Sequence, residues 1–127
     1  MKNPRLIIPN NIKPAPTRAE LEVAQLLARH FSADARFIVR MNCKTPDFLI
    51  NGVEWELKSP TGGGKRNIQH QFQKGLLQSK YLAIDLRRSK IHISKSLREI
   101  DFQFRKTRGI KGLIVIKKDG TVLELKK

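Results

Sequence analysis

Cysteine is almost absent from this sequence, since Cys43 is the only one among 127 residues. A single thiol excludes an internal disulfide framework and a cysteine-rich zinc site, and we expect Cys43 to be a small, buried or half-buried strand residue. Long hydrophobic runs are also missing. No segment approaches the roughly 18 consecutive apolar residues of a membrane-spanning helix, and no secretory signal peptide opens the chain. These absences predict action in the cytoplasm and no membrane partner.

Acidic residues are scarce: 11 Asp and Glu stand against 26 Lys and Arg, which gives a formal net charge of +15. A charge of this size predicts a polyanionic partner. Nucleic acid fits best, because the chain has no basic amphipathic helix with a bulky aromatic face to bind an anionic membrane surface. If three of the eleven acids bound a metal, the remaining surface would be more basic still.

Residues 45–58 contain the most informative pattern, a β-hairpin. Asn51-Gly52 between two apolar alternations is the strongest short-range signal for a type I′ turn, which needs φ > 0 at both central positions. With that turn, Asp47 faces Glu56 across the strands, and Lys58 points to the same side as Glu56. The opposite face is wholly apolar and consists of Phe48, Ile50, Val53, Trp55 and Leu57.

Two carboxylates directly opposite each other, with Cβ atoms about 5 Å apart, destabilise a hairpin. A divalent cation turns this repulsion into ligation, and Mg²⁺ is typically held by one or two carboxylates with waters and substrate phosphate oxygens. Lys58 can meet a nucleophilic water or a phosphate oxygen. Asp47, Glu56 and Lys58 therefore predict a metal site that hydrolyses a phosphodiester. The alternative is an ordinary hairpin with a charged, solvated outer face.

The remaining patterns predict one domain, residues 17–127, after an extended arm. Residues 1–16 carry four prolines and predict a weakly structured arm with room for a short strand at residues 6–8. Hydrophobic periodicity and turn signals predict the other elements: helices at residues 17–31, 67–79 and 94–107, and strands at 36–41, 46–50, 53–59, 81–86, 112–117 and 121–125.

Glu20 lies in the first turn of the first helix, at the centre of its apolar face. Thr17 and Glu20 form a capping box, in which the Thr caps and the Glu reaches back. A buried Glu is costly unless it is paired or bound to metal. Two interpretations, which do not exclude each other, are that Glu20 only caps the helix, or that it also points toward Asp47 and Glu56 as a third acid.

Several polar residues outside the hairpin are further candidates. The glycine-rich loop at residues 61–66 lets the backbone approach a ligand, although it lacks P-loop spacing and can equally be a linker. Gln71 lies on a polar stripe of the second helix and could orient a water or a phosphate. Asp85 is a candidate acid or a partner of the basic turn after it. The cations expected to contact nucleic acid are Lys65, Arg66, Lys74, Arg87 and Arg88.

The order of elements, with acids on the first helix and on the hairpin, resembles the PD-(D/E)xK nuclease superfamily through Pro46-Asp47 and Glu56-Leu57-Lys58. A longer match comprises Thr45-Pro-Asp-Phe-Leu, Trp55-Glu-Leu-Lys-Ser-Pro-Thr-Gly62, Asn67-Ile-Gln-x-Gln71, Gln78-Ser79 and Asp85-Leu-Arg-Arg-Ser89. It looks like the tRNA nuclease domain at the C-terminus of contact-dependent growth inhibition toxins, and like its stand-alone relatives. The resemblance spans roughly residues 17 to 125.

This resemblance implies an α/β fold with a restriction-endonuclease-like core: a mixed sheet with a helix before the catalytic hairpin and helices flanking the sheet. It implies that Asp47 and Glu56 bind Mg²⁺ or another divalent cation with Glu20, that Lys58 is the catalytic lysine and that Gln71 lines the site. It further implies cleavage of tRNA and, in toxin systems, a cognate immunity protein.

Several alternatives stay open. Such toxin domains end a very large secreted protein, whereas this chain starts with Met and is expected to be complete, so it is either an excised toxin domain or a free intracellular relative. The superfamily also includes DNA endonucleases of restriction or repair type. The ribose 2′-hydroxyl, rather than water, could attack the phosphate. Finally, a non-catalytic basic module would bind nucleic acid through charge alone.

Overall fold

The computed structural model describes residues 3–41, 45–61 and 67–126. Within these residues, seven strands form one sheet in the order β1-β2-β3-β4-β5-β6-β7. The pairs β1–β2, β4–β5 and β5–β6 are parallel, and the other three pairs are antiparallel. The elements are β1 (Leu6–Ile7), α1 (Arg18–Phe31), β2 (Ala35–Phe37), β3 (Phe48–Ile50), β4 (Val53–Lys58), α2 (Asn67–Leu76), β5 (Tyr81–Asp85), α3 (Ile93–Lys106), β6 (Gly112–Ile116) and β7 (Val122–Leu125).

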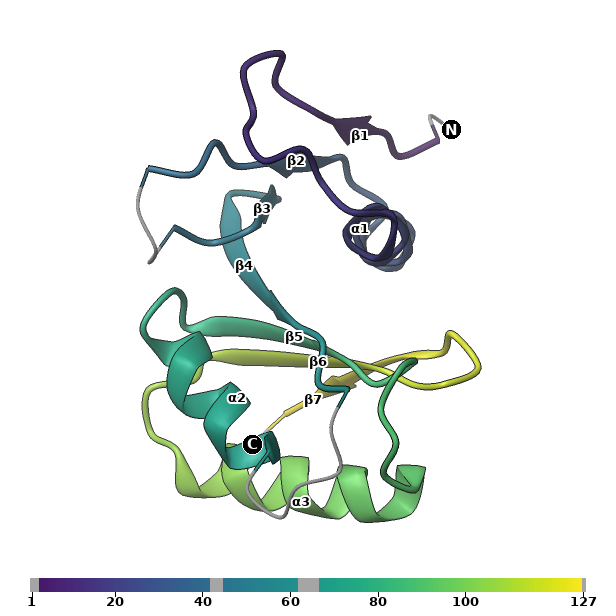
Figure 1. Ribbon diagram of the computed structural model, residues 1–127, viewed down its shortest axis with the longest axis vertical. Helices are drawn as coiled ribbons and strands as arrows, with labels where there is room; N and C mark the ends of the chain where they lie inside the picture. Colours follow the sequence, from purple (N-terminus) through teal and green to yellow (C-terminus); the bar gives the residue numbers. More distant parts are fainter. Residues whose placement is uncertain (1–2, 42–44, 62–66, 127) are drawn as a thin grey trace.

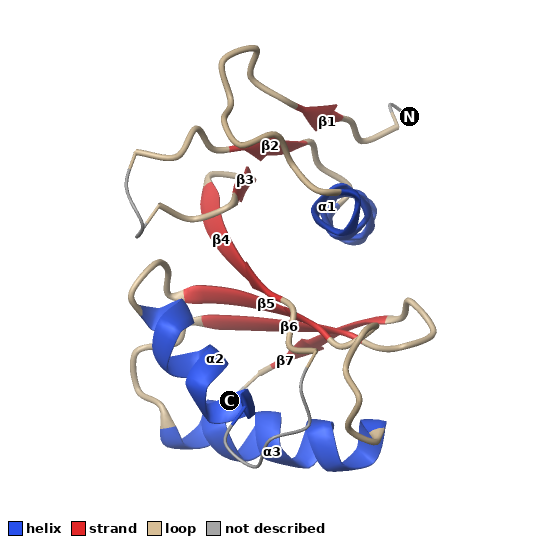
Figure 2. Cartoon of the chain, viewed as in Figure 1, coloured by secondary structure: helices blue, strands red, loops and turns tan. Residues whose placement is uncertain are grey.

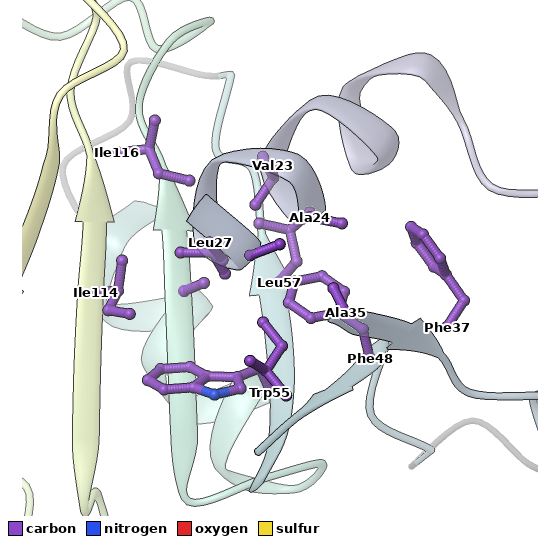
Figure 3. Close-up of a cluster of buried hydrophobic side chains, with 13 residues drawn as sticks. Val23, Ala24, Leu27, Ala35, Phe37, Phe48, Trp55, Leu57, Ile114 and Ile116 are labelled. Carbon is purple, nitrogen blue, oxygen red and sulfur yellow. The ribbon is translucent and has the colours of Figure 1, made fainter. Parts of the chain in front are cut away.

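Helices cover both faces of the sheet, because successive side chains of a buried strand point to opposite sides. On β5, Ala83 packs in a core cluster with residues of α1 such as Leu27. Its neighbours Leu82 and Ile84 pack in a second cluster with α2 and α3. Figure 2 shows α1 on one side of the sheet and the other two helices on the opposite side, and Figure 3 shows the α1 side of the core. The prediction of a mixed α/β fold with flanking helices is confirmed.

The first helix begins at the predicted capping box. The Glu20 amide donates to Thr17 Oγ1 at 3.1 Å, and the Thr17 amide donates to Glu20 Oε1 at 2.9 Å. Both contacts satisfy N–H groups that have no partner inside the helix. Val23, Ala24 and Leu27 then bury the apolar face of α1 against the sheet.

The predicted hairpin register is confirmed for the three pairs nearest the turn, but the expected Asp47–Glu56 pair is not part of the ladder. The Asp47 amide donates instead to the Trp55 carbonyl at 3.0 Å. Asn51 and Gly52 have φ values of 53° and 76°, as a type I′ turn requires. Phe48 pairs with Trp55. Beyond Trp55, β4 leaves β3 and pairs instead with β5, where Glu56 lies beside Leu82. Figure 1 shows β4 bridging the β1–β3 part of the sheet and the β5–β7 part.

One strand prediction near the arm differs from the structure. The strand expected at residues 36–41 covers only Ala35–Phe37. The last backbone hydrogen bond toward the chain before β3 is the one that Ile38 donates to the Asp47 carbonyl at 3.0 Å. The pairing ends there because Pro46 has no N–H group to donate. The short strand expected within the arm at residues 6–8 is present as β1, which forms the edge of the sheet, parallel to β2.

The later elements follow the predictions closely. α2 ends at Leu76, and residues 77–79 form a turn in which Gln78 and Ser79 donate to the Gly75 carbonyl at 2.9 Å. α3 and the β6–β7 hairpin lie within a few residues of their expected positions. Cys43 and the glycines of the loop at residues 61–66 fall outside the described residues. No helix of the described residues is long and apolar enough to span a membrane.

Candidate active site

Asp47 lies where the backbone pairing of β3 with β4 ends. Its amide donates to the Trp55 carbonyl at 3.0 Å. Its side chain takes over the next contact, because Oδ2 accepts from the Leu57 amide at 2.8 Å. Burial is the main cause that raises the pKa of Asp47, and the contact with Leu57 opposes it. The local backbone therefore fixes this carboxyl beside the second half of β4.

Glu56 is one of two acids that are almost fully buried in the described part of the chain, with 2% exposed against 1% for Asp85. It shares a sheet face with Leu82, its register partner on β5, so an apolar cluster surrounds it on one side. One carboxyl oxygen, Oε2, contacts Lys58 Nζ at 2.8 Å. The other, Oε1, is buried with no hydrogen-bond partner among the described residues. Burial, followed by the charge on Asp47, raises the pKa of Glu56 to about 8.

Lys58 is held between β4 and the end of α2. Its ammonium group contacts Glu56 and donates to Gln78 Oε1 at 2.7 Å. Gln78 in turn donates to the Thr45 carbonyl at 3.4 Å. An ammonium has three N–H donors, so one donor of Lys58 is left for a ligand in this network of described residues. The side chain is 18% exposed, which leaves it reachable.

Gln78 is a residue of the site that the sequence argument did not select. Gln78 appeared within the longer family pattern, as Gln78-Ser79. The signal that could have identified Gln78 is its position at the end of the second helix, directly before Ser79. In the structure the Ser79 hydroxyl donates to the Glu54 carbonyl at 2.6 Å. That contact brings the turn against β4 beside Lys58.

Glu20 lies near Asp47 but does not join it in a metal cluster. Both residues line one small cavity, and the charge of Glu20 contributes to the raised pKa of Asp47. Among the described residues, however, no group of three or more His, Cys, Asp or Glu side chains is placed to hold a metal ion. Both interpretations of Glu20 are thus partly met: it caps α1 and faces Asp47, without a three-acid site.

Asp47 and Glu56 by themselves fit a divalent cation. Two carboxylates with waters are a normal ligand set for Mg²⁺. The buried Oε1 of Glu56 is an acceptor that a cation would satisfy, and the charge of that cation would lower the pKa of both acids, which burial raises.

Gln71, Lys74 and Arg88 are not members of the hydrogen-bond network of Asp47, Glu56, Lys58 and Gln78 in the described part of the chain. Gln71 is half-buried on α2 and donates to Asn67 at 3.3 Å; among the described residues no hydrogen bond links it to the acids or to Lys58. Lys74 and Arg88 are exposed and free to meet a polyanion, and their role stays a prediction. Lys65 and Arg66 lie outside the described residues.

Arg87 is engaged inside the fold. Its guanidinium contacts the buried carboxylate of Asp85 at 2.9 and 3.0 Å and Glu22 of α1 at 3.5 Å. It also donates to the Ala19 carbonyl at 3.4 Å. The expected pairing of Asp85 with the basic turn is therefore confirmed, and much of the charge of Arg87 is already balanced by two carboxylates.

The fold and the acid–lysine network define a mixed α/β protein with a buried Glu56 on a β-hairpin and a half-buried Asp47 beside it. Residues 44–122 match the family described as the contact-dependent growth inhibition CdiA C-terminal domain. This match covers more than half of the 127 residues, so the chain belongs to that family.

A solved structure, described as a CdiA-CT/CdiI toxin and immunity complex from Burkholderia pseudomallei, contains a chain with a similar fold. The similarity covers 97% of this chain and 99% of that chain, with a TM-score of 0.68 and 23% sequence identity. No match was found among the curated proteins.

Proposed function

We propose that this protein is a metal-dependent endonuclease of the PD-(D/E)xK type that cleaves a phosphodiester bond in RNA, with tRNA favoured over DNA. The observation that carries the proposal is the state of Glu56: a carboxyl group that is 2% exposed, next to a second carboxyl, with one oxygen held by Lys58 and the other unsatisfied. Such an arrangement costs folding free energy and is typical of functional sites.

Each side chain of the network has a role in this proposal. Asp47 and Glu56 would hold Mg²⁺, which when bound supplies a Lewis acid at the phosphoryl oxygen. Lys58, held in place by Gln78, would direct its remaining N–H toward the attacking water or a phosphate oxygen. There its charge would offset the negative charge that develops on the phosphate during attack. In this proposal Gln71 lines the site from α2 without touching the acids.

The substrate follows from charge and from family membership. A net charge of +15 favours a polyanion, and cations such as Lys74 and Arg88 would hold its backbone without reading sequence. The similarity of residues 45–89 to tRNA nuclease domains favours tRNA. We further propose that the protein acts as a toxin domain in the cytoplasm of a target cell and that a cognate immunity protein blocks it, by analogy with the similar toxin–immunity complex.

The test is cleavage of total tRNA and of plasmid DNA, each with Mg²⁺ and with EDTA, by the wild type and by Asp47→Ala and Lys58→Ala. We expect tRNA cleavage that needs the metal and is lost in both variants. Metal-dependent cleavage of DNA alone would replace RNA with DNA as the substrate. Binding of nucleic acid without cleavage, unchanged in both variants, would refute the enzyme and leave a basic binding module.

The ends of the products identify the nucleophile. Attack by water leaves a 5′-phosphate or a 3′-phosphate next to a free hydroxyl, whereas attack by the ribose 2′-hydroxyl leaves a 2′,3′-cyclic phosphate. The proposal expects a 5′-phosphate. A cyclic product that also forms in EDTA would assign general acid and base roles to Lys58 and the acids and remove the metal from the account.

A further inference from the structure

A small cavity adjoins Asp47 on the side of the N-terminal arm. Its volume is about 80 Å³, and its walls come from the arm, the start of α1, the chain after β2 and the chain before β3. Since a water occupies about 30 Å³ of liquid, the cavity has room for a few waters or one phosphate group, but not for a nucleotide. Whatever enters it lies next to Asp47, one of the two acids of the candidate site.

The cavity is lined by charges of both signs. Glu20 and Asp47 provide its carboxylates, while Lys13 of the arm and Arg40 after β2 provide its cations. Both cations are exposed. The salt bridges found within the described part of the chain involve other basic residues, so Lys13 and Arg40 are not committed to a carboxylate there, in contrast to Arg87.

The arm is fixed in a way that keeps Lys13 at the cavity. Its strand β1 pairs with β2. The Asp34 carboxylate accepts a hydrogen bond from the Arg5 amide at 2.8 Å and forms a salt bridge with the Arg5 guanidinium at 3.7 Å. Pro14 and Pro16, which also line the cavity, restrict the backbone on the way to α1. Figure 1 shows the arm leaving β1, looping beyond β2 and returning to the start of α1.

We propose that Lys13 and Arg40 form a phosphate-binding subsite for the substrate backbone beside Asp47, so that the arm is part of the substrate site. The inference rests on the proposed nuclease function. A phosphate that approaches two carboxylates is repelled, and two cations on the same cavity offset that repulsion at short range. Both cations lie outside residues 44–122, the part of the chain that matches the family.

The test compares the double variant Lys13→Ala/Arg40→Ala with the control Arg108→Ala/Lys118→Ala, which removes two exposed cations from the α3–β6 and β6–β7 connections. Fluorescence anisotropy with labelled tRNA in EDTA gives the Kd at several salt concentrations. Single-turnover cleavage in Mg²⁺ gives the half-saturating enzyme concentration and the maximal rate.

For the Lys13/Arg40 variant we expect a roughly tenfold weaker Kd and a slope of log K against log salt that is smaller by about 1.4–1.8, since each lost phosphate contact removes about 0.7–0.9. The half-saturating concentration should rise in parallel while the maximal rate stays within a factor of about two. The control should change the Kd by less than about twofold.

An equal loss of tRNA affinity in the Arg108/Lys118 control would overturn the proposed subsite, because it would show that binding depends on the overall positive charge. So would an unchanged salt slope in the Lys13/Arg40 variant, or a loss confined to the maximal rate. If the wild type cleaves neither tRNA nor DNA, the nuclease function fails. The anisotropy slope then decides by itself whether Lys13 and Arg40 bind phosphate.

Discussion

Replacing Glu56 by Gln should make the protein more stable at neutral pH when no metal is present. Burial and the charge on Asp47 raise the pKa of Glu56 from 4.5 to about 8. Between these pH values the folded protein holds a proton that the unfolded chain has released. The free energy of unfolding of the wild type therefore falls as the pH rises through this window. The amide that Glu56→Gln introduces cannot ionise, so the variant escapes this loss.

The magnitude follows from the width of the window. Each unit of pKa difference corresponds to about 1.4 kcal/mol, and both pH 5 and pH 7 lie inside the window set by the two pKa values. The wild type should lose about 2–3 kcal/mol relative to Glu56→Gln between pH 5 and pH 7. For a domain of this size, that difference corresponds to a relative shift in Tm of roughly 10 °C.

Urea denaturation at pH 5 and pH 7 in EDTA measures the effect. Glu54→Gln is the matched control, because Glu54 lies on the same strand two residues earlier but is exposed. The control should keep a constant offset from the wild type at both pH values. A constant offset for Glu56→Gln as well would refute the buried, protonated state on which the account of the site depends.

Three further predictions concern the network around the acid pair. Mg²⁺ should raise the Tm of the wild type more at pH 8 than at pH 6, because binding to Glu56 releases a proton, and Asp47→Asn should abolish the shift in a thermal melt. Gln78→Ala should lower kcat about tenfold with little change in KM, because Lys58 loses the contact that orients it. If Gln78 only bound substrate, steady-state kinetics would show a raised KM with an unchanged kcat. Arg87→Ala should destabilise the protein by about 3–5 kcal/mol in urea titrations, because Asp85 stays buried without its partner, and a change below about 1 kcal/mol would exclude this structural role.

Local sequence signals predicted the parts of the fold that depend on neighbouring residues. Asn51-Gly52 fixed the turn, and with it the register that puts Asp47 near Glu56. The Thr17–Glu20 capping box marked the start of α1. In both cases the backbone contacts that decide the structure lie within a few residues of the pattern.

Features that depend on distant contacts could not be predicted in the same way. Gln78 reaches Lys58 only because β4 pairs with β5 and draws the end of α2 against the hairpin. The balance of charge at Arg87 depends on Glu22, 65 residues earlier in α1. The C-terminal end of β2 depends on Pro46, which precedes β3 and has no N–H to continue the ladder. None of these pairings leaves a periodic trace in the sequence.

If the buried carboxyl of Glu56 serves phosphodiester cleavage, its loss and the loss of the exposed carboxyl of Glu54 on the same strand should have very different effects on activity. Single-turnover cleavage of tRNA in Mg²⁺ at neutral pH would be measured for Glu56→Gln and for Glu54→Gln, which make the same chemical change two residues apart. The account predicts a loss of at least about 100-fold for Glu56→Gln and a rate within about twofold of the wild type for Glu54→Gln. A Glu56→Gln protein that folds and cleaves tRNA at the wild-type rate would contradict it.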